Sequence, residues 1–281
     1  MSERKDRVTV ARLQKMKRER EPIAMLTAYD YPTGQLAEAS GVDVVLVGDS
    51  LGMVVLGYES TVPVTLEDMV HHTRAVRRGI SRPLLVADLP FLTYRLGVRD
   101  ALQAAGRLMQ EGGASAVKME GGRDLAPTVK ACVEAGIPVM GHIGLKPQAV
   151  HQTGYRIQGK TEQSVRELVD DAEALTEAGA FAFVLECVTE EAAQTISESV
   201  PVPTIGIGSG RQCDGQVLVF HDVVQFSVNG FRPSFVKTYA DAGETVLSGL
   251  AEYVRDVKNR RFPQEQHVFH GKSAVYGGTK R

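Results

Sequence analysis

The stretch Val42-Asp43-Val44-Val45-Leu46-Val47-Gly48-Asp49-Ser50 decides the fold that this sequence predicts. Four large apolar residues stand together in its middle without a polar break. Such a run is typical of a strand that is buried on both faces of a parallel sheet. It stops at Gly48, and a carboxylate and a hydroxyl follow at once. Because ligands bind at the carboxyl ends of parallel strands, we expect Asp49 and Ser50 to lie at a ligand site.

Similar short apolar runs recur along the chain, and helical patterns separate them. Further strands are predicted at 23–28, 83–87, 116–120, 138–144, 181–185, 202–210 and 235–239, and helices at about 9–18, 33–40, 65–79, 98–110, 125–135, 161–178, 190–199 and 242–261. Thr65 and Asp68 form a capping pattern at the start of the third helix. Segment 216–226 fits a strand or a helix, and we assign it as helix because 235–239 makes a better eighth strand. Eight alternations in this length favour a closed (β/α)8 TIM barrel with an extra N-terminal helix over an open doubly wound sheet.

The composition indicates one globular domain. No linker rich in Pro, Gly or Ser divides the 281 residues, so we predict a single barrel domain over 1–281 with a polar C-terminal tail from about 262 to 281. A net charge of −2 gives no reason to expect nucleic acid. No apolar run is long enough to cross a bilayer, and the N-terminus lacks the apolar core of a signal peptide, so we expect a cytoplasmic protein without membrane contact. Three widely spaced cysteines fit reduced thiols: Cys132, Cys187 and Cys213.

Polar side chains stand at or near the ends of most predicted strands, and in a barrel they all point to the carboxyl-terminal mouth. They are Asp49 with Ser50, Asp88, Lys118 with Glu120, His142, Glu186, and Lys237 with Tyr239. Carboxylates on three consecutive strands, which lie about 4.8 Å apart, repel one another unless a divalent cation, Lys118 or a proton balances their charge. An all-oxygen set favours Mg²⁺ over zinc. A carboxylate–lysine network without metal is the alternative.

Glu186 stands two strands beyond Glu120, after an apolar run that should desolvate it. A carboxylate across the mouth from a metal suits a general base that removes a carbon-bound proton, and a salt-bridge or cap residue is the alternative. His142 fits a ligand, an acid, a hydrogen-bond donor to substrate or a core histidine. Loop 145–160 is a candidate lid by its length and glycine content.

Six segments together resemble the ketopantoate hydroxymethyltransferase family, in the same order and over roughly residues 9–258. They are Met25-Leu26-Thr27-Ala28-Tyr29-Asp30, Val47-Gly48-Asp49-Ser50-Leu51-Gly52, Ala87-Asp88-Leu89-Pro90-Phe91, Val117-Lys118-Met119-Glu120-Gly121-Gly122, Gly141-His142-Ile143-Gly144-Leu145 and Leu185-Glu186-Cys187-Val188. The resemblance implies a barrel of the phosphoenolpyruvate/pyruvate type. It also implies transfer of a hydroxymethyl group from 5,10-methylenetetrahydrofolate to 3-methyl-2-oxobutanoate, the first committed step of pantothenate biosynthesis, with one Mg²⁺ per subunit and a homodecamer.

Carried over by position, the resemblance makes Asp49 and Asp88 Mg²⁺ ligands and puts Glu120 in or next to the metal shell. It implies that Asp49, Ser50, Asp88 and Lys118 contact the 2-oxo acid, and that Glu186 is the catalytic base. The residues alone leave two other functions open. One is a carbon–carbon lyase or mutase that acts on an oxaloacetate-like acid and needs no folate. The other is a sensor that binds a 2-oxo acid without turning it over.

Overall fold

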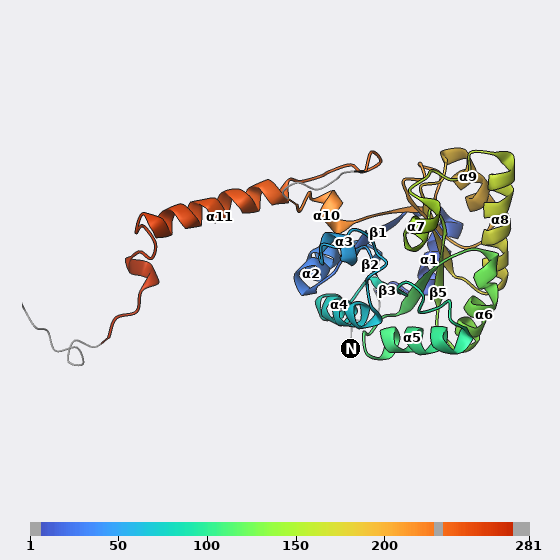
Figure 1. The fold of residues 1–281 in the computed structure, drawn as a ribbon, viewed down its shortest axis with the longest axis horizontal. Coiled ribbons are helices and arrows are strands. Elements are labelled where there is room, and N and C mark those ends of the chain that lie inside the picture. Colours follow the sequence, from blue (N-terminus) through green and yellow to red (C-terminus); the bar gives the residue numbers. More distant parts are fainter. Residues whose placement is uncertain (1–6, 228–232, 272–281) are drawn as a thin grey trace, which may run out of the picture.

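A computed structural model describes residues 7–227 and 233–271, and in this part of the chain eight parallel strands close into a barrel (Figure 1). The strands follow one another around the barrel in chain order, and β8 closes on β1. Their bounds are β1 Ile23–Thr27, β2 Val44–Val47, β3 Leu84–Asp88, β4 Ala116–Glu120, β5 Val139–Gly144, β6 Ala182–Glu186, β7 Thr204–Ile207 and β8 Gly215–Leu218. The predicted (β/α)8 barrel is confirmed.

Helices alternate with the strands and cover the outside of β2 to β7. The α-helices are α1 Val10–Glu19, α2 Tyr31–Ala39, α3 Leu51–Val54, α4 Leu66–Gly79, α5 Val98–Gln110, α6 Ala126–Glu134, α7 Val150–Thr153, α8 Glu162–Glu177, α9 Glu190–Ser199, α10 Phe220–Val223 and α11 Ala242–Lys258. Short 3₁₀ turns are η1 Arg123–Leu125, η2 Pro147–Ala149 and η3 Glu265–His267. The predicted cap of α4 is present, because Thr65 Oγ1 accepts from the Asp68 N–H at 3.1 Å and Asp68 Oδ2 accepts from the Thr65 N–H at 3.0 Å.

Two hydrophobic cores hold the barrel. One lies between the strands and the surrounding helices. The other fills the barrel interior and includes Leu13 and Met16 of α1. Val8, just before α1, donates its N–H to the carbonyl of Arg82 ahead of β3, and Lys17 bonds Asp214 ahead of β8. The extra N-terminal helix therefore packs at the amino ends of the strands, opposite the predicted mouth.

The eighth strand is Gly215–Leu218, and the prediction of residues 235–239 for it was wrong. Gly215 pairs with Ile23, and a Cβ on this glycine would lie 2.3 Å from the Ile23 carbonyl oxygen, so only glycine lets the two strands approach. Residues 235–239 belong to an arm that leads to α11. Lys237 lies 4.7 Å over the Tyr239 ring there, and the two side chains are not at the end of a barrel strand as predicted.

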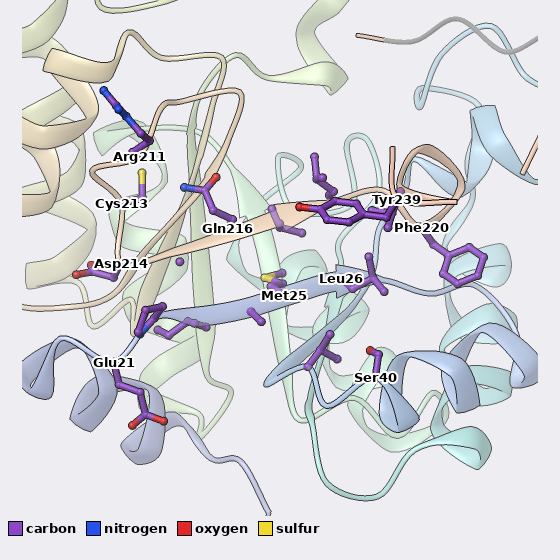
Figure 2. A pocket seen from close by; sticks show the side chains of 18 of the residues that line it. Glu21, Met25, Leu26, Ser40, Arg211, Cys213, Asp214, Gln216, Phe220 and Tyr239 are labelled. Carbon is purple, nitrogen blue, oxygen red and sulfur yellow. The ribbon is translucent and has the colours of Figure 1, made fainter. Parts of the chain in front are cut away.

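No helix in the described part of the chain covers the outer face of β1 and β8. Every residue of β2, β3 and β4 is buried, whereas outward residues of the closing strands, among them Ala24 and Gln216, are exposed. A groove of about 1050 Å³ runs along this face, and Leu26, Leu36 and Tyr239 are among the residues that line it (Figure 2). The outside of the barrel is thus uncovered at one place, between its first and last strands.

Helix α11 projects away from the barrel instead of covering that groove (Figure 1). None of its residues is buried, although the helix was correctly predicted over about 242–261. Backbone bonds fix where it begins, since the Ala242 N–H donates to Val224 and the Gly243 N–H to Gln225. None of the helices in the described part of the chain is long and apolar enough to span a membrane. Of the predicted polar tail, residues 272–281 lie outside the described residues.

Candidate active site

The carboxyl ends of β2 to β6 bring together side chains that were predicted from separate parts of the sequence: Asp49, Ser50, Asp88, Lys118, Glu120, His142 and Glu186. The pairing register explains how they meet. Asp88 stands opposite Lys118, and Glu120 stands opposite His142. Because Lys118 and Glu120 are two residues apart on one strand, both side chains point to the same face.

Lys118 is the cation at the centre of this cluster. Its Nζ lies 2.9 Å from Asp88 Oδ1 and 3.8 Å from Glu120 Oε1, and the side chains of all three are nearly inaccessible to solvent. Burial opposes the ammonium charge, but the surrounding carboxylates outweigh it and raise the pKa of Lys118 above its ordinary value. The lysine is therefore charged and neutralises part of the buried acid.

Asp49 is the carboxyl of the cluster that makes no ion pair with Lys118. Its backbone N–H donates to Asp88 Oδ2 at 3.1 Å, which ties the end of β2 to the end of β3. Burial, with the charges of Asp88 and Glu120, raises the pKa of the Asp49 carboxyl well above its usual range. Burial also raises the pKa of Asp88, and Lys118 limits that rise. The cluster consequently favours a proton or a further cation beside Asp49.

His142 links this cluster to Glu186. Its Nδ1 lies 3.0 Å from Lys118 Nζ and 3.5 Å from Glu120 Oε1, and its Nε2 lies 3.3 Å from Glu186 Oε2. Burial and Lys118 oppose protonation of the ring, whereas Glu120 and Glu186 favour it and raise the pKa of His142 to about 9. At 3.0 Å, however, two donors in a buried site would repel, so one of the two nitrogens must accept. We assign an imidazole that accepts from Lys118 at Nδ1 and keeps its proton on Nε2, which lies near Glu186 but makes no hydrogen bond to it.

Glu186 differs from the other carboxylates in its exposure. Its side chain is 18% exposed, against 3–4% for Asp88 and Glu120, so the apolar run before it desolvates it less than expected. It is the last residue of β6, and its open side is available to a ligand at the mouth. The Glu186 carboxylate can therefore approach a substrate on its open side, and His142 Nε2 lies 3.3 Å from Oε2 on the other side.

Three further residues in contact with the cluster were not predicted. Gln148, in η2, bonds Asp49 and Glu120, and the Tyr94 hydroxyl bonds Gln148. Tyr29 is fully buried, and its hydroxyl lies 2.9 Å from Ser50 Oγ. Gln148 stands in a polar loop whose sequence carries no periodic signal. Through Gln148, the start of loop 145–160, the candidate lid, is hydrogen-bonded to the cluster, and only the three-dimensional structure shows this contact.

The residues fit a hard divalent cation through their chemistry. The donors are carboxylate oxygens, their charge exceeds that of Lys118, and no hydrogen bond within the described residues reaches Asp49 Oδ1. Among residues 7–227 and 233–271, no three His, Cys, Asp or Glu side chains are already grouped as a metal site. Lys118 instead bridges Asp88 and Glu120, which is the carboxylate–lysine network named above as the alternative.

The family model and the similar sequences found by comparison carry names for the same enzyme family. The family model described as ketopantoate hydroxymethyltransferase matches residues 7–265. A relative from Carboxydothermus hydrogenoformans, named 3-methyl-2-oxobutanoate hydroxymethyltransferase, is 56% identical over 265 residues, which cover 94% of this chain and 96% of the relative. Among solved structures, 2,3-dimethylmalate lyase of the PEP mutase/isocitrate lyase superfamily is similar with a TM-score of 0.57 at 16% identity, covering 92% of this chain and 91% of that one. Phosphonopyruvate hydrolase, solved with oxalate and Mg²⁺, is similar with a TM-score of 0.59 at 13% identity, covering 95% and 93%. The two structures bear on the fold alone.

Proposed function

The chain belongs to the ketopantoate hydroxymethyltransferase family, and from this membership we propose that it transfers a hydroxymethyl group from 5,10-methylenetetrahydrofolate to 3-methyl-2-oxobutanoate in the cytoplasm. The product is 2-dehydropantoate (ketopantoate), and the reaction is the first committed step of pantothenate biosynthesis. The observation that carries the proposal is the partly open Glu186 carboxylate at the barrel mouth, held beside His142 and next to the buried acid–lysine cluster.

Glu186 is the base in this proposal. It takes the proton from C3 of the 2-oxo acid, and the electron pair of that C–H bond moves toward the 2-oxo group. C3 then forms a carbon–carbon bond with the methylene carbon of the folate as one of its two C–N bonds breaks. Water breaks the second C–N bond and supplies the hydroxyl oxygen, and the two folate nitrogens take the proton from Glu186 and one proton from the water, which gives tetrahydrofolate. His142 Nε2 lies 3.3 Å from Glu186 Oε2 without the geometry of a hydrogen bond, so the imidazole stands next to the base and leaves its oxygens open to the C3 proton.

The other residues bind and orient the 2-oxo acid. We propose that Asp49 and Asp88 hold one Mg²⁺ with Glu120 next to it, and that Asp49, Ser50, Asp88 and Lys118 contact the substrate. A bound Mg²⁺ supplies positive charge where negative charge develops on the 2-oxo oxygen. The Lys118 ammonium balances the substrate carboxylate, and the Tyr29–Ser50 contact of 2.9 Å fixes the Ser50 hydroxyl.

Deuterium exchange tests the base directly. Incubation of 3-methyl-2-oxobutanoate in D₂O with the protein and Mg²⁺, without folate, should remove the C3 proton signal in proton NMR. Glu186→Gln should slow this exchange about 10²- to 10⁴-fold, the usual contribution of a positioned base. Glu190→Gln is the matched control, because Glu190 pairs with Arg211 at the surface. Exchange at the unaltered rate in Glu186→Gln would remove this residue from its role.

The exchange assay and an assay of product formation together separate the competing functions. A sensor would bind the 2-oxo acid without exchange, because it needs no base. A lyase or mutase for an oxaloacetate-like acid would work without folate. Formation of 2-dehydropantoate that depends on 5,10-methylenetetrahydrofolate therefore supports the transferase, and cleavage of an oxaloacetate-like acid without folate would overturn it.

We also propose that the protein is a homo-oligomer, the decamer expected from the family resemblance. Helix α11 carries an exposed apolar stripe with helical spacing: Val246, Leu247, Leu250, Tyr253, Val254 and Val257. The barrel groove over β1 and β8 is not filled by any helix among residues 7–227 and 233–271. Because α11 leaves the barrel at α10 and spans about 25 Å, we infer that it fills this groove on a second copy of the chain.

The mass of the particle in solution tests this association. Leu250→Asp puts a charge in the apolar stripe and should lower the mass measured by light scattering after size-exclusion chromatography. Glu252→Gln, on the opposite side of the helix, should leave the mass unchanged. An unaltered mass for Leu250→Asp, or a monomeric unmodified protein at micromolar concentration, would contradict exchange of α11.

A further inference from the structure

Gln148 is a neutral side chain placed inside the cluster of buried acids. It is 7% exposed, and all its side-chain polar atoms are used. Nε2 donates to Asp49 Oδ2 at 2.8 Å and to the Leu89 carbonyl at 2.9 Å, and Oε1 accepts from the Tyr94 hydroxyl at 2.7 Å. Its backbone N–H donates to Glu120 Oε2 at 3.1 Å. One residue of the loop after β5 therefore contacts acids that come from two other strands.

Because of these bonds, the two carboxylate oxygens of each acid have different surroundings. Asp49 Oδ2 is bound to the Gln148 amide, while no hydrogen bond from the described residues reaches Asp49 Oδ1. Glu120 Oε2 is bound to the Gln148 backbone, while Glu120 Oε1 faces Lys118 and His142. A hydrogen bond from a neutral donor to a carboxylate is strong in a buried site and holds the carboxylate in one orientation. Gln148 thus leaves one oxygen of Asp49 free for a ligand.

Tyr94 fixes the orientation of the Gln148 amide in turn. Its hydroxyl accepts from the Glu120 N–H at 3.2 Å. Two acceptors stand near its own proton, Gln148 Oε1 at 2.7 Å and the Glu120 carbonyl at 3.2 Å, and the shorter contact favours Gln148. With Oε1 occupied in this way, the Nε2 hydrogens must face Asp49 and Leu89. Tyr94 is itself 2% exposed, and the loop after β3 is thereby connected to the loop after β5 through this pair.

We propose that Gln148 is a positioning residue which, together with Tyr94, holds Asp49 ready for a divalent cation and the 2-oxo acid. The inference rests on the proposed function, because it concerns the same site. A residue that only fills space would change the stability of the fold when replaced. A positioning residue also changes the affinity of the site for a cation. Loss of a hydrogen bond to a metal-binding carboxylate typically weakens metal affinity about 10- to 100-fold.

The test measures Mn²⁺ binding by the electron paramagnetic resonance signal of free Mn²⁺, with and without 3-methyl-2-oxobutanoate. Gln148→Met keeps the length of the side chain and removes both amide donors, so the Kd for Mn²⁺ should rise about 10- to 100-fold. Tyr94→Phe should raise the Kd in the same direction by a smaller factor, because the Gln148 donors remain. Gln194→Met is the control, since Gln194 bonds Glu198 on the exposed face of α9, and the Kd for Mn²⁺ of this variant should not change.

Thermal unfolding of each variant shows whether it is folded. If Gln148→Met does not fold, the rise in Kd for Tyr94→Phe decides, and no rise overturns the inference. Mn²⁺ binding by folded Gln148→Met within twofold of the unmodified protein overturns it as well, and leaves the proposed function intact. No Mn²⁺ binding by the unmodified protein, even with the 2-oxo acid, would overturn the proposed cation chemistry and this inference together.

Discussion

Replacement of Lys118 by methionine would remove the ammonium group that balances Asp88 and Glu120. The lost contacts are 2.9 Å to Asp88 Oδ1 and 3.8 Å to Glu120 Oε1. With an effective dielectric constant near 20, the shorter contact amounts to about 6 kcal/mol and the longer one to about 4 kcal/mol, and the desolvation of the lysine offsets part of the sum. Removal of one partner from a buried pair costs about 3–5 kcal/mol overall, so Lys118→Met should lower the free energy of unfolding by that amount at pH 8.

The loss should depend on pH, and its sign follows from Asp88. Burial already raises the pKa of this carboxyl in the folded protein, and removal of Lys118 raises it further. A carboxyl whose pKa is higher in the folded than in the unfolded protein binds its proton more tightly in the folded state. The stability that this contributes is fully present at pH values below the pKa of the unfolded protein. That contribution is lost as the pH rises through the folded pKa. The destabilisation by Lys118→Met should therefore be smaller at pH 5 than at pH 8.

Urea unfolding followed by circular dichroism, at one chain concentration and at several pH values, measures both effects. Lys130→Met is the control, because its pair with Glu134 is exposed and 3.9 Å long, and it should change the free energy of unfolding by no more than about 0.5 kcal/mol. A Lys118→Met midpoint equal to that of the control at pH 8 would refute the reasoning, as would a deficit that does not change with pH.

Three further outcomes are expected. Burial and the Glu186 charge raise the pKa of the Cys187 thiol to about 11, so alkylation of Cys187, followed by mass spectrometry, should be slow at pH 8. In Glu186→Gln the pH profile of the alkylation rate should shift to lower pH. An unshifted profile would contradict the contribution of the Glu186 charge. Thr65→Ala removes the cap of α4 and should cost about 1 kcal/mol in chemical unfolding, whereas Thr65→Ser should cost much less. A Cβ on Gly141 would lie 2.6 Å from the Phe183 ring, so Gly141→Ala should cost about 1–3 kcal/mol, and a Phe183→Leu background should relieve most of it if the clash is the cause.

The sequence predicted from the strand ends which candidate site residues lie together, but it predicted less of how they contact one another. A buried strand followed by an acid is a local pattern, and it placed Asp49, Asp88 and Glu120 correctly at the carboxyl ends of adjacent strands. The same local rule failed for 235–239, which is apolar enough for a strand but does not pair with one. Gly215–Leu218 became β8 because its glycine allows close approach to β1, and this requirement appears only when the barrel closes.

By itself, the sequence determined the alternation of strands and helices, the barrel class and the positions of the acids, because these depend on the spacing of apolar residues along short segments. Only the tertiary structure decided which groups meet. The amide of Gln148 reaches Asp49 across 99 residues of sequence. The course of α11 away from the barrel likewise leaves β1 and β8 uncovered. Contacts of this kind depend on strand register and barrel closure, and neither leaves a periodic signal in the chain.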